Sequence, residues 1–486
     1  MDKNISQLSP EKVWKHFMAI CSIPHPSKHE EAIAKYVVDF AAEHEIECHV
    51  DKTGNVLLRK PATEGMEGCK GIIMQGHLDM VAQKNGDKEF DFLKDGIEPY
   101  IDGEWLTANG TTLGADNGMG VAAALAVMES TDLVHGDIEA LFTIDEETGM
   151  TGAFGLEPDF LKGDILMNLD SEDEGELYVG CAGGVDAVCT LPISKEAIAV
   201  GSATYNVELK GMKGGHSGME IILQRGNAIK ALARVLNAAS KVADIKIADF
   251  AGGDVRNAIP RECGSVVVVA ASDCQSFETK LAEELDLIIK ELKATEEGIE
   301  LIVSKIDAVA ESFDGATTKN LLNLLTAHPN GTIRMSDSLK GLVETSINLG
   351  VVKCSEKEVT FISLLRSSSD SSKDYLASQL ISIFELAGGV ANMVGGYNGW
   401  TPNMDSAILK TMQESYKNLY GKTPEIKAIH AGLECGIIGG VYPKMDMISF
   451  GPTIRFPHSP DEKVLISSVE KFYNFLVYSL ANAPLK

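Results

Sequence analysis

The sequence is short of positive charge and of long apolar runs. Its 486 residues include 43 basic and 70 acidic side chains, which gives a formal net charge of −27 at pH 7. Nucleic acids and anionic membranes bind proteins through clustered positive charge, so this balance argues against both as partners. The longest clean apolar run, Val121 to Met128, is far shorter than the roughly 20 residues of a membrane-spanning helix.

Cysteines that are spaced for disulfides or for metal binding are also missing. The nine cysteines are scattered, odd in number and never arranged as Cys-x-x-Cys. Secreted proteins usually pair their cysteines, whereas cytosolic proteins keep their thiols reduced. The first residues, Met1 to Asn4, have no signal-peptide character and are expected to lead directly into a helix. These features predict reduced thiols and a cytoplasmic location.

The length of the chain exceeds what one ordinary core accommodates and predicts two or three domains. Apolar strands alternate with helices, which is typical of a mixed, mostly parallel sheet with helices on both faces. After the glycine-rich stretch 180–184 the pattern changes to two βαβ-like rounds. We therefore expect an α/β domain formed by residues 1–188 and 399–486, interrupted by an inserted α+β domain at 189–398. An internal doubling of the insert is one interpretation, although its halves share no visible sequence identity.

Polar side chains follow three apolar strands of the predicted sheet. His77 and Asp79 follow the strand at 71–74, Glu146 and Glu147 belong to the end of that at 138–144, and Asp170 follows that at 165–169. In open α/β sheets the site lies outside the carboxyl ends of the strands, so these side chains are expected to meet at one edge. Each pattern alone is also typical of an ordinary strand end. Their repetition at three strands favours a functional site.

Two further candidates lie in loops that precede helices. Asp116 is flanked by glycines just before an alanine-rich helix predicted at 121–130, and glycine lets the backbone approach a ligand. A tight turn with a helix cap is the alternative interpretation of that stretch. His458 precedes Ser459 and Glu462, which have capping-box spacing, with a proline suited to the first helical position. We therefore expect His458 to be held directly ahead of the closing helix.

The residue types at this edge suit a pair of metal ions. Two histidines and three or four carboxylates can hold two divalent cations if one carboxylate bridges them, and mixed nitrogen and oxygen ligands fit zinc, cobalt or manganese. Such a pair clamps a nucleophilic water and polarises a carbonyl group. Glu146 and Glu147 are adjacent, so one can ligate a metal while the other serves as general base.

Together the motifs resemble those of the di-zinc metallopeptidase family that includes the aminoacylases and glutamate carboxypeptidases. The similarity rests on residues 74–79, 114–118, 145–149 and 168–170 and on His458, and it follows the whole chain in order. The resemblance implies two metal ions, zinc first, bridged by Asp116. It implies five metal ligands in all: His77, Asp116, Glu147, Asp170 and His458. One ion would be completed by His77 and Asp170 and the other by Glu147 and His458. Glu146 would then be the general base, and Asp79 would orient His77.

Motifs in the insert and beyond it look most like the bacterial aminoacyl-histidine dipeptidase branch of this family. They are residues 215–218, 257–260 and 432–436. The resemblance implies a lid that brings His216 to the scissile carbonyl, where an imidazole stabilises a developing oxyanion. It also implies that Asn257, Arg366 and Gly432 surround the carboxyl-terminal residue of a substrate. A guanidinium suits a free carboxylate, although an edge-strand Arg366 paired with an acid such as Asp370 is the alternative.

The resemblance therefore implies a metallo-dipeptidase that hydrolyses unblocked dipeptides, Xaa-His among them. Two alternatives remain: a deacylase of N-acyl amino acids, and a non-catalytic binding module on the same scaffold. An acid near the metals, such as Asp173, would favour a free amine over an acyl chain, and a binding module would lack the base or a metal ligand. The histidine preference rests on the resemblance alone. The family often pairs through its lid, a contact that a doubled insert would replace, so homodimer and monomer both remain open.

Overall fold

The computed structural model describes residues 5–486, so the expectation for Met1 to Asn4 lies outside the described residues. The chain divides into two compact units. The first unit comprises Met1–Gly180, Trp400–Ala428 and Leu433–Lys486, and the second comprises Cys181–Gly399 and Ile429–Gly432. All nine cysteines lie in the described part and carry free thiols, as expected. Among residues 5–486, no helix has the length and apolar character that a membrane crossing requires.

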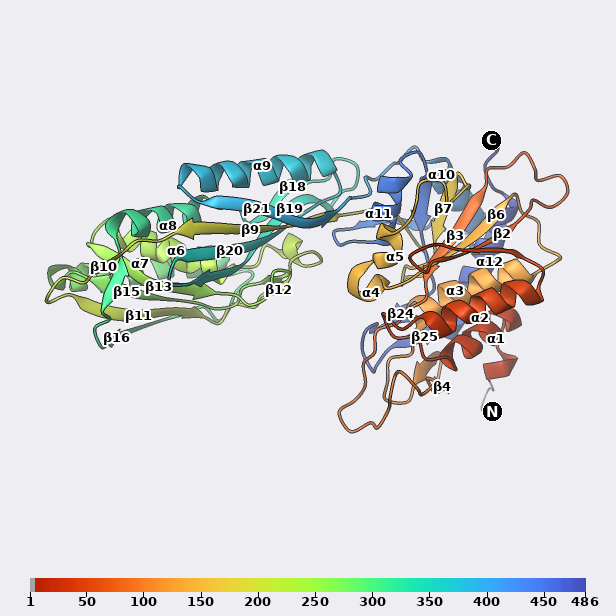
Figure 1. Cartoon of the computed structure of the whole chain (residues 1–486), viewed down its shortest axis with the longest axis horizontal. Helices are drawn as coiled ribbons and strands as arrows, with labels where there is room; N and C mark the ends of the chain where they lie inside the picture. Colours follow the sequence, from red (N-terminus) through yellow and green to blue (C-terminus); the bar gives the residue numbers. More distant parts are fainter. Residues whose placement is uncertain (1–4) are drawn as a thin grey trace. The chain divides into compact units, whose positions relative to one another are not determined.

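A mixed sheet of eight strands lies at the centre of the first unit, with helices on both faces (Figure 1). In order along the sheet, its strands are β1 (Glu47–Val50), β2 (Val56–Lys60), β6 (Ile138–Thr143), β3 (Ile72–His77), β7 (Ile165–Asn168), β23 (Asp446–Ser449), β8 (Glu176–Cys181) and β22 (Glu425–Ile429). The central strands β6, β3, β7 and β23 are parallel neighbours, whereas β1 and β2 run antiparallel at one edge. Every residue of β3, β6 and β7 is buried, which requires cover on both faces. The predicted α/β class with a mixed sheet is confirmed.

The helices of the first unit pack their apolar sides against this sheet and against one another. They are α1 (Glu11–Cys21), α2 (Glu31–Glu43), α3 (Ala115–Glu129), α4 (Glu146–Gly149), α5 (Thr151–Phe154), α10 (Ala407–Tyr420), α11 (Glu434–Val441) and α12 (Ile466–Ala481), with a short 3-10 turn, η1, at Ile5–Gln7. A Cβ atom at Gly76 in β3 would lie 2.2 Å from Oδ1 of Asn117, so glycine allows β3 and α3 to approach this closely. The helix α3 is counted from Ala115, but Asp116 (φ −88°, ψ 107°) and Asn117 (φ −107°, ψ 29°) have non-helical backbone angles. The regular helix therefore begins after them, and Asp116 lies in the irregular segment that precedes it, as expected.

A second, four-stranded sheet of the first unit determines where the closing helix begins. Its strands, in order, are β24 (Ile454–Arg455), β25 (Lys463–Leu465), β5 (Trp105–Ala108) and β4 (Pro99–Asp102). Because β25 pairs with β5, the chain is extended there and α12 starts only at Ile466. The predicted capping box at Ser459 and Glu462 is therefore wrong, since both residues precede this strand.

The second unit contains a nine-stranded antiparallel sheet (Figure 1). Its strands, in order, are β16 (Glu300–Ile306), β11 (Ala203–Lys210), β15 (Cys263–Val269), β13 (Ile245–Gly252), β19 (Val343–Cys354), β20 (Glu358–Ser367), β9 (Gly183–Pro192) and β21 (Val390–Tyr397), with β18 (Gly331–Met335) beside β19. Its helices are α6 (Ala228–Ala239), α7 (Cys274–Leu292), α8 (Gly315–Ala327) and α9 (Asp370–Leu386). Smaller elements are β10 (Lys195–Ala197) with β17 (Glu311–Phe313), β12 (Gly215–His216) with β14 (Ala258–Ile259), and the 3-10 turns η2 (Ile221–Leu223) and η3 (Ala271–Asp273).

The topology of this sheet is doubled. One round runs β11-α6-β13-β15-α7-β16 and lies in the order β16-β11-β15-β13. The other runs β9-α8-β19-β20-α9-β21 and lies in the order β21-β9-β20-β19, so both rounds have the βαββαβ arrangement. The first round is inserted between β9 and α8 of the second, and β13 pairs with β19 where the two rounds meet. Each round contains four strands, whereas a single βαβ unit contains two. The pair β13–β15 in one round and the pair β19–β20 in the other run antiparallel.

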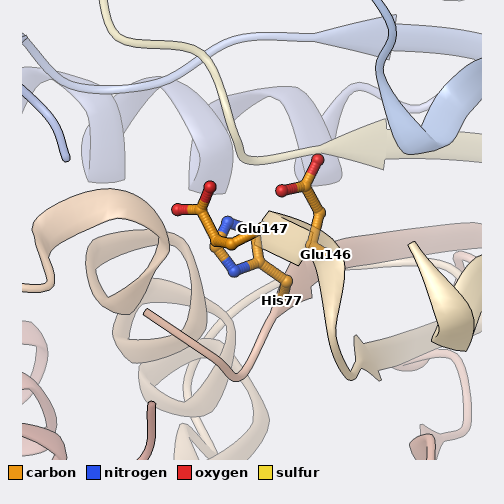
Figure 2. A group of neighbouring side chains, drawn as sticks. All are labelled: His77, Glu146 and Glu147. Carbon is orange, nitrogen blue, oxygen red and sulfur yellow. The ribbon is translucent and has the colours of Figure 1, made fainter. Parts of the chain in front are cut away.

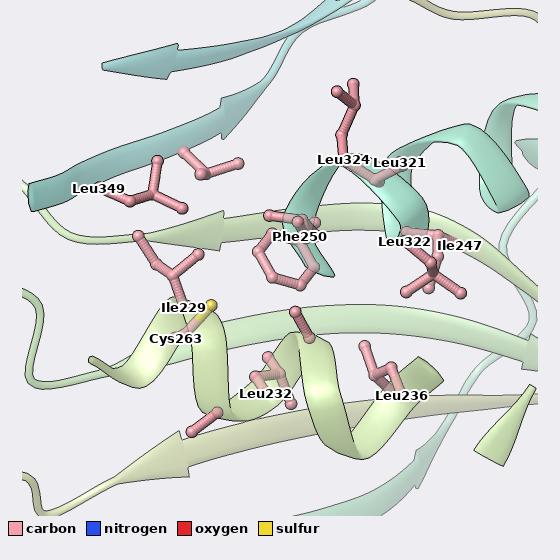
Figure 3. Close-up of a cluster of buried hydrophobic side chains, with 14 of the residues drawn as sticks. Ile229, Leu232, Leu236, Ile247, Phe250, Cys263, Leu321, Leu322, Leu324 and Leu349 are labelled. Atoms are coloured by element: carbon pink, nitrogen blue, oxygen red, sulfur yellow. The ribbon is translucent and has the colours of Figure 1, made fainter. Parts of the chain in front are cut away.

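The core of the second unit lies between its helices and this sheet (Figure 3). In α6, Ile229, Leu232 and Leu236 recur at helical spacing and are fully buried. They meet strand residues such as Ile247 and Phe250 of β13, which are also fully buried. This apolar periodicity is typical of a helix with one buried face, and the burial of that face holds α6 on the sheet.

Candidate metal centre

His77 stands at the end of β3 with its two ring nitrogens facing different partners. Its Nδ1 lies 2.9 Å from the backbone oxygen of Asp79 and must donate, because a carbonyl oxygen can only accept. In the neutral ring Nε2 then has no proton, and it lies 3.2 Å from Oδ1 of Asp116 and 3.3 Å from Oδ1 of Asp170. A nitrogen lone pair and two carboxylates repel one another unless a positive charge lies between them. This arrangement therefore suits a metal ligand whose other nitrogen is oriented by the chain.

A second histidine faces the other oxygen of the same aspartate. Nε2 of His458 lies 3.3 Å from Oδ2 of Asp116 and 3.0 Å from Oε2 of Glu147. The carboxylate of Asp116 thus lies between the two histidines, with Oδ1 facing His77 and Oδ2 facing His458. The structure brings together residues that the sequence separates by more than 300 positions, and it gives Asp116 the geometry of a bridging carboxylate.

The atoms around Asp116 meet the requirements of two cation sites. Possible ligand atoms lie within 4.8 Å of one another in three groups: His77, Asp116 and Asp170; Asp116, Glu147 and His458; and His77, Glu146 and Glu147. Oε1 of Glu147 and Oδ1 of Asp170 are buried and have no hydrogen-bond partner among the described residues. In the view of Figure 2, the carboxylates of Glu146 and Glu147 point to opposite sides of the His77 ring. Nitrogen and oxygen donors with orphaned buried oxygens fit divalent transition-metal ions.

The carboxylates favour positive charge at both histidine rings. Burial lowers the pKa of His77, but the charge of Asp170 and a hydrogen bond with Asp116 raise it well above its usual value. Hydrogen bonding to Asp116 and Glu147 raises the pKa of His458 to about 11. Burial also raises the pKa of Asp170, to about 7. The cluster therefore attracts cations, protons and metal ions alike.

A metal ion that binds beside His458 is expected to displace a proton at neutral pH. With a pKa of about 11 the ring is charged at pH 7 in the metal-free protein, whereas a ligating ring must be neutral. The affinity for this ion should therefore rise with pH, by about tenfold per pH unit for each proton released, until the pH passes the pKa. Calorimetric titrations in buffers of different ionisation enthalpy would count the protons. Heats that do not depend on the buffer would contradict the expectation.

The segment that carries Glu146 and Glu147 is held by two buried carboxylates. The backbone N–H of Glu146 donates to Oδ1 of Asp79 at 2.9 Å, and that of Glu147 donates to Oδ2 of Asp79 at 3.2 Å. The N–H of Asp145, whose φ is 53°, donates to Oε1 of Glu30 at 3.0 Å. Asp79 thus supports the site twice, through its carbonyl oxygen at the β3 end and through its carboxylate at α4.

Glu30, Asp79 and Asp145 form a further group of buried acids. The hydroxyl of Ser27 donates to Asp79 at 2.8 Å, and those of Thr148 and Thr151 donate to Asp145. Their oxygens are thus engaged by the chain itself, and the group is a support for the site. Sequence reasoning missed Glu30, because nothing in its helix-start surroundings distinguishes it from an exposed acid.

Beneath the strand ends, a row of buried polar side chains crosses the central sheet. Gln75 in β3 donates to Oε2 of Glu434 at 2.6 Å, and Asn168 in β7 donates to Oε1 of Gln75 at 2.6 Å. Thr143 in β6 donates to Oε2 of Glu434 at 2.8 Å, and Ser449 in β23 donates to Oδ1 of Asn168 at 2.5 Å. All five side chains are fully buried. Since such groups are costly to bury unless hydrogen-bonded, the network favours one arrangement of the strand ends. Sequence reasoning missed it, because these residues lie inside or beside apolar runs.

In the second unit, His216 has a fixed tautomer. Its Nδ1 accepts hydrogen bonds from the backbone N–H groups of Gly218 at 3.3 Å and Met219 at 3.1 Å. These groups can only donate, so Nδ1 carries no proton and the neutral ring carries its proton on Nε2. Burial and the charge of Arg366 lower the pKa of His216, which keeps the ring neutral. His216 therefore presents a hydrogen-bond donor at Nε2.

Arg366 lies inside the second sheet and not at its edge. It belongs to β20, between β19 and β9, and is only 6% exposed. Its Nη1 lies 3.4 Å from the hydroxyl of Tyr397, and its Nε has no hydrogen-bond partner among the described residues. Asp370 instead pairs with Lys373 at 2.7 Å. The alternative of an edge arginine paired with Asp370 is therefore wrong, and the guanidinium keeps donor capacity for a ligand.

Asn257 and Gly432 are linked to these two side chains. The N–H of Ser217 donates to the backbone oxygen of Asn257 at 2.8 Å, which joins Asn257 to the segment of His216. A Cβ atom at position 432 would lie 2.9 Å from the ring of Tyr397, so glycine there lets this partner of Arg366 pack closely. Asn257 is thus joined to the segment of His216, and Gly432 to the partner of Arg366, through direct neighbours.

Asp173, the acid expected to favour a free amine, is already engaged. Its Oδ1 lies 2.6 Å from Nη2 of Arg455. The charge of Asp173 is largely balanced by this contact, which weakens it as a receptor for a substrate amine.

Comparisons with known proteins find relatives along the whole chain. Residues 73–482 match the model of the family described as Peptidase family M20/M25/M40. The cytosol non-specific dipeptidase of Escherichia coli (strain K12) is 48% identical over 482 residues, which cover 99% of this chain and 99% of that protein. The crystal structure of aminoacylhistidine dipeptidase from Vibrio alginolyticus matches with a TM-score of 0.96 and 49% identity, over 100% of this chain and 99% of that chain. An aminopeptidase from Bacillus cereus shares the fold, with a TM-score of 0.55 and 16% identity over 98% of this chain and 99% of that chain.

Proposed function

The chain belongs to peptidase family M20/M25/M40 as a metallo-dipeptidase, and on this basis we propose that it cleaves unblocked dipeptides, Xaa-His among them, at a two-metal site. The observation that carries the proposal is the position of Asp116 between two histidines. Its Oδ1 lies 3.2 Å from Nε2 of His77 and its Oδ2 lies 3.3 Å from Nε2 of His458. A carboxylate placed in this way suits a bridge between two ions.

The five ligand side chains would hold the ions in two overlapping sets. Metallopeptidases of this family bind divalent metal ions, and the nitrogen and oxygen donors here suit zinc, with cobalt or manganese as alternatives. His77 and Asp170 would hold one ion, Glu147 and His458 the other, and Asp116 both. When bound, the two ions supply Lewis acidity to the scissile carbonyl and to the attacking water.

Glu146 would act as the general base. Burial raises the pKa of its carboxyl well above the usual value, so the carboxylate readily accepts a proton from the attacking water. The same group would then return this proton to the nitrogen of the leaving amine. In the neighbouring Glu147, Oε2 lies 3.0 Å from Nε2 of His458, so Glu147 would serve as a metal ligand and not as the base.

His216 and Arg366 belong to the second unit, which would serve as a lid. His216 would bind the scissile carbonyl group of the substrate, and Arg366 would bind its terminal carboxylate. The fixed tautomer of His216 offers an Nε2–H donor to the carbonyl oxygen as negative charge develops there. The orphaned Nε of Arg366 and its free donors suit a carboxylate bound bidentately, with Asn257 and Gly432 beside it. A receptor for the carboxylate one residue beyond the scissile bond limits the substrate to a dipeptide.

The named relatives bear on substrate range and location. The Vibrio alginolyticus protein is named for aminoacylhistidine substrates, and the Escherichia coli protein is named non-specific and cytosolic. We therefore propose that Xaa-His belongs to a broader set of dipeptide substrates.

The acidic net charge of −27 and the free cysteines support a cytoplasmic enzyme without nucleic-acid or membrane partners.

A substrate panel tests this function. Xaa-His and other dipeptides should be hydrolysed by the metal-loaded enzyme, whereas forms with an amidated carboxyl terminus should lose about 10- to 100-fold in kcat/KM, because hydrogen bonds to charged groups contribute about 1.5–3 kcal/mol. Arg366→Lys should reduce this discrimination. Arg234→Lys, a change at an exposed arginine paired with Glu284 and Glu291, serves as the control.

Each alternative gives a different result in the same panel. Faster cleavage of N-acetylated amino acids than of free dipeptides would identify a deacylase. No hydrolysis of any member, with two ions bound, would identify a binding module.

A further inference from the structure

Glu462 binds the backbone at the start of α3 with both of its carboxylate oxygens. Oε2 accepts the N–H groups of Leu113 at 2.7 Å and Gly114 at 3.0 Å. Oε1 accepts those of Ala115 at 2.8 Å and Asp116 at 3.2 Å. The residue is 2% exposed. One buried side chain thus takes four consecutive N–H groups and ends on the N–H of the aspartate between the two histidines.

The start of α3 needs such a partner. The first N–H groups of a helix have no acceptor within the helix, and the cap residue here, Gly114, has no side chain to supply one. Its φ of 71° turns the chain so that successive N–H groups point the same way. A carboxylate also interacts favourably with the positive end of the helix dipole.

Glu462 is itself fixed on the other side of the site. It follows His458 by four positions, and its N–H donates to the backbone oxygen of Ser459 at 3.0 Å. Its own backbone oxygen accepts from the hydroxyl of Thr107 in β5 at 2.7 Å, next to the strand pairing of β25. Both the main chain and the side chain of Glu462 are therefore held. The residue joins the segment of His458 to the segment of Asp116.

We propose that Glu462 is a positioning residue that sets the separation of Asp116 and His458, and with it the affinity for the ion that these two would share with Glu147. The inference rests on the proposed two-metal site and goes beyond it, because Glu462 ligates nothing. Glu462 acts on Asp116 by accepting its backbone N–H. It acts on His458 by fixing the segment of chain that the two residues share.

Glu462→Gln is the sharpest variant. The variant keeps the shape of the side chain. In the wild type each carboxylate oxygen of Glu462 accepts two N–H groups, and in the variant an NH₂ group, which cannot accept, must face two of these donors. Asp461→Asn is the matched control, since it removes the same charge at the adjacent, exposed position. If Glu462→Gln does not fold, Glu462→Asp retains the charge and shortens the reach.

Two measurements on these variants test the proposal. In the metal-free protein, hydrogen exchange at the amides of residues 113–116 should accelerate in Glu462→Gln and stay unchanged in Asp461→Asn. In calorimetric titration with zinc, the variant should bind the ion shared by Asp116, Glu147 and His458 about 10- to 100-fold more weakly, the usual effect of losing a group that orients a ligand. The other ion, which has only Asp116 in common with that set, should lose less affinity. Excess zinc should then restore kcat.

The outcomes separate this inference from the function on which it rests. Wild-type affinity for both ions in Glu462→Gln would overturn it, as would an equal loss at both ions that follows a lowered Tm. A wild-type protein that binds fewer than two ions would instead overturn the proposed two-metal site, whatever the exchange rates at residues 113–116.

Discussion

Replacement of Glu146 by glutamine is expected to lower kcat by about 10²- to 10⁴-fold while two metal ions stay bound. Glutamine has nearly the same shape, so the segment held by Asp79 should keep its position, but an amide cannot take a proton from water and return it. Burial raises the pKa of Glu146 well above its usual value, and the charges of Asp170 and Glu434 add to this effect. The substitution removes this basicity and little else.

The neighbouring glutamate provides the contrasting variant. Glu147→Gln should weaken binding of one ion, because Oε2 of Glu147 faces His458 at 3.0 Å, and its activity should recover as metal is added. Metal content by elemental analysis, measured beside kcat, distinguishes the two effects. Near-normal turnover by Glu146→Gln at full metal content would refute its role as base.

Removal of the metal ions is expected to abolish hydrolysis without unfolding the protein. The carboxylates hold the pKa of His77 well above its usual value and that of His458 at about 11, so protons can occupy both rings and balance the acids. The buried network below the strand ends does not depend on the ions. Re-supplied zinc, cobalt or manganese should restore activity toward Xaa-His dipeptides, whereas magnesium, which prefers all-oxygen sites, should not.

Bound metal should also stabilise the fold. An ion at a thousandfold excess over its Kd adds about 4 kcal/mol to the free energy of unfolding, provided that it binds only the native state. Thermal unfolding with and without zinc measures this change, and circular dichroism of the metal-free protein serves as the control for folding. Turnover by protein shown to be metal-free would contradict the mechanism.

Some of this site follows from rules that act locally in the sequence. Parallel strands end at one edge of a sheet, and this rule identified His77, Glu146 and Asp170 without any knowledge of tertiary contacts. Asp116 was marked by its glycines, and it lies, as expected, in a non-helical segment ahead of the regular part of α3. The alternation of the second unit predicted strands, but not that they pair antiparallel in two equivalent rounds.

Other parts could not be predicted, because their partners lie far away in the sequence. Glu462 has the spacing of a capping box with Ser459, and only the pairing of β25 with β5 shows that its carboxylate binds Leu113 to Asp116 instead. An acid beside Arg366 in the sequence suggested an ion pair, yet Asp370 pairs with Lys373. A local sequence pattern thus predicts the hydrogen-bond or ion-pair partner of a side chain only when no residue distant in the sequence competes for it.

The central claim is that five side chains hold two cations that share Asp116. Anomalous diffraction from zinc-loaded crystals tests it most directly. We predict two zinc peaks, one among His77, Asp116 and Asp170 and the other among Asp116, Glu147 and His458. A single peak, or peaks that do not contact Asp116, would contradict the account.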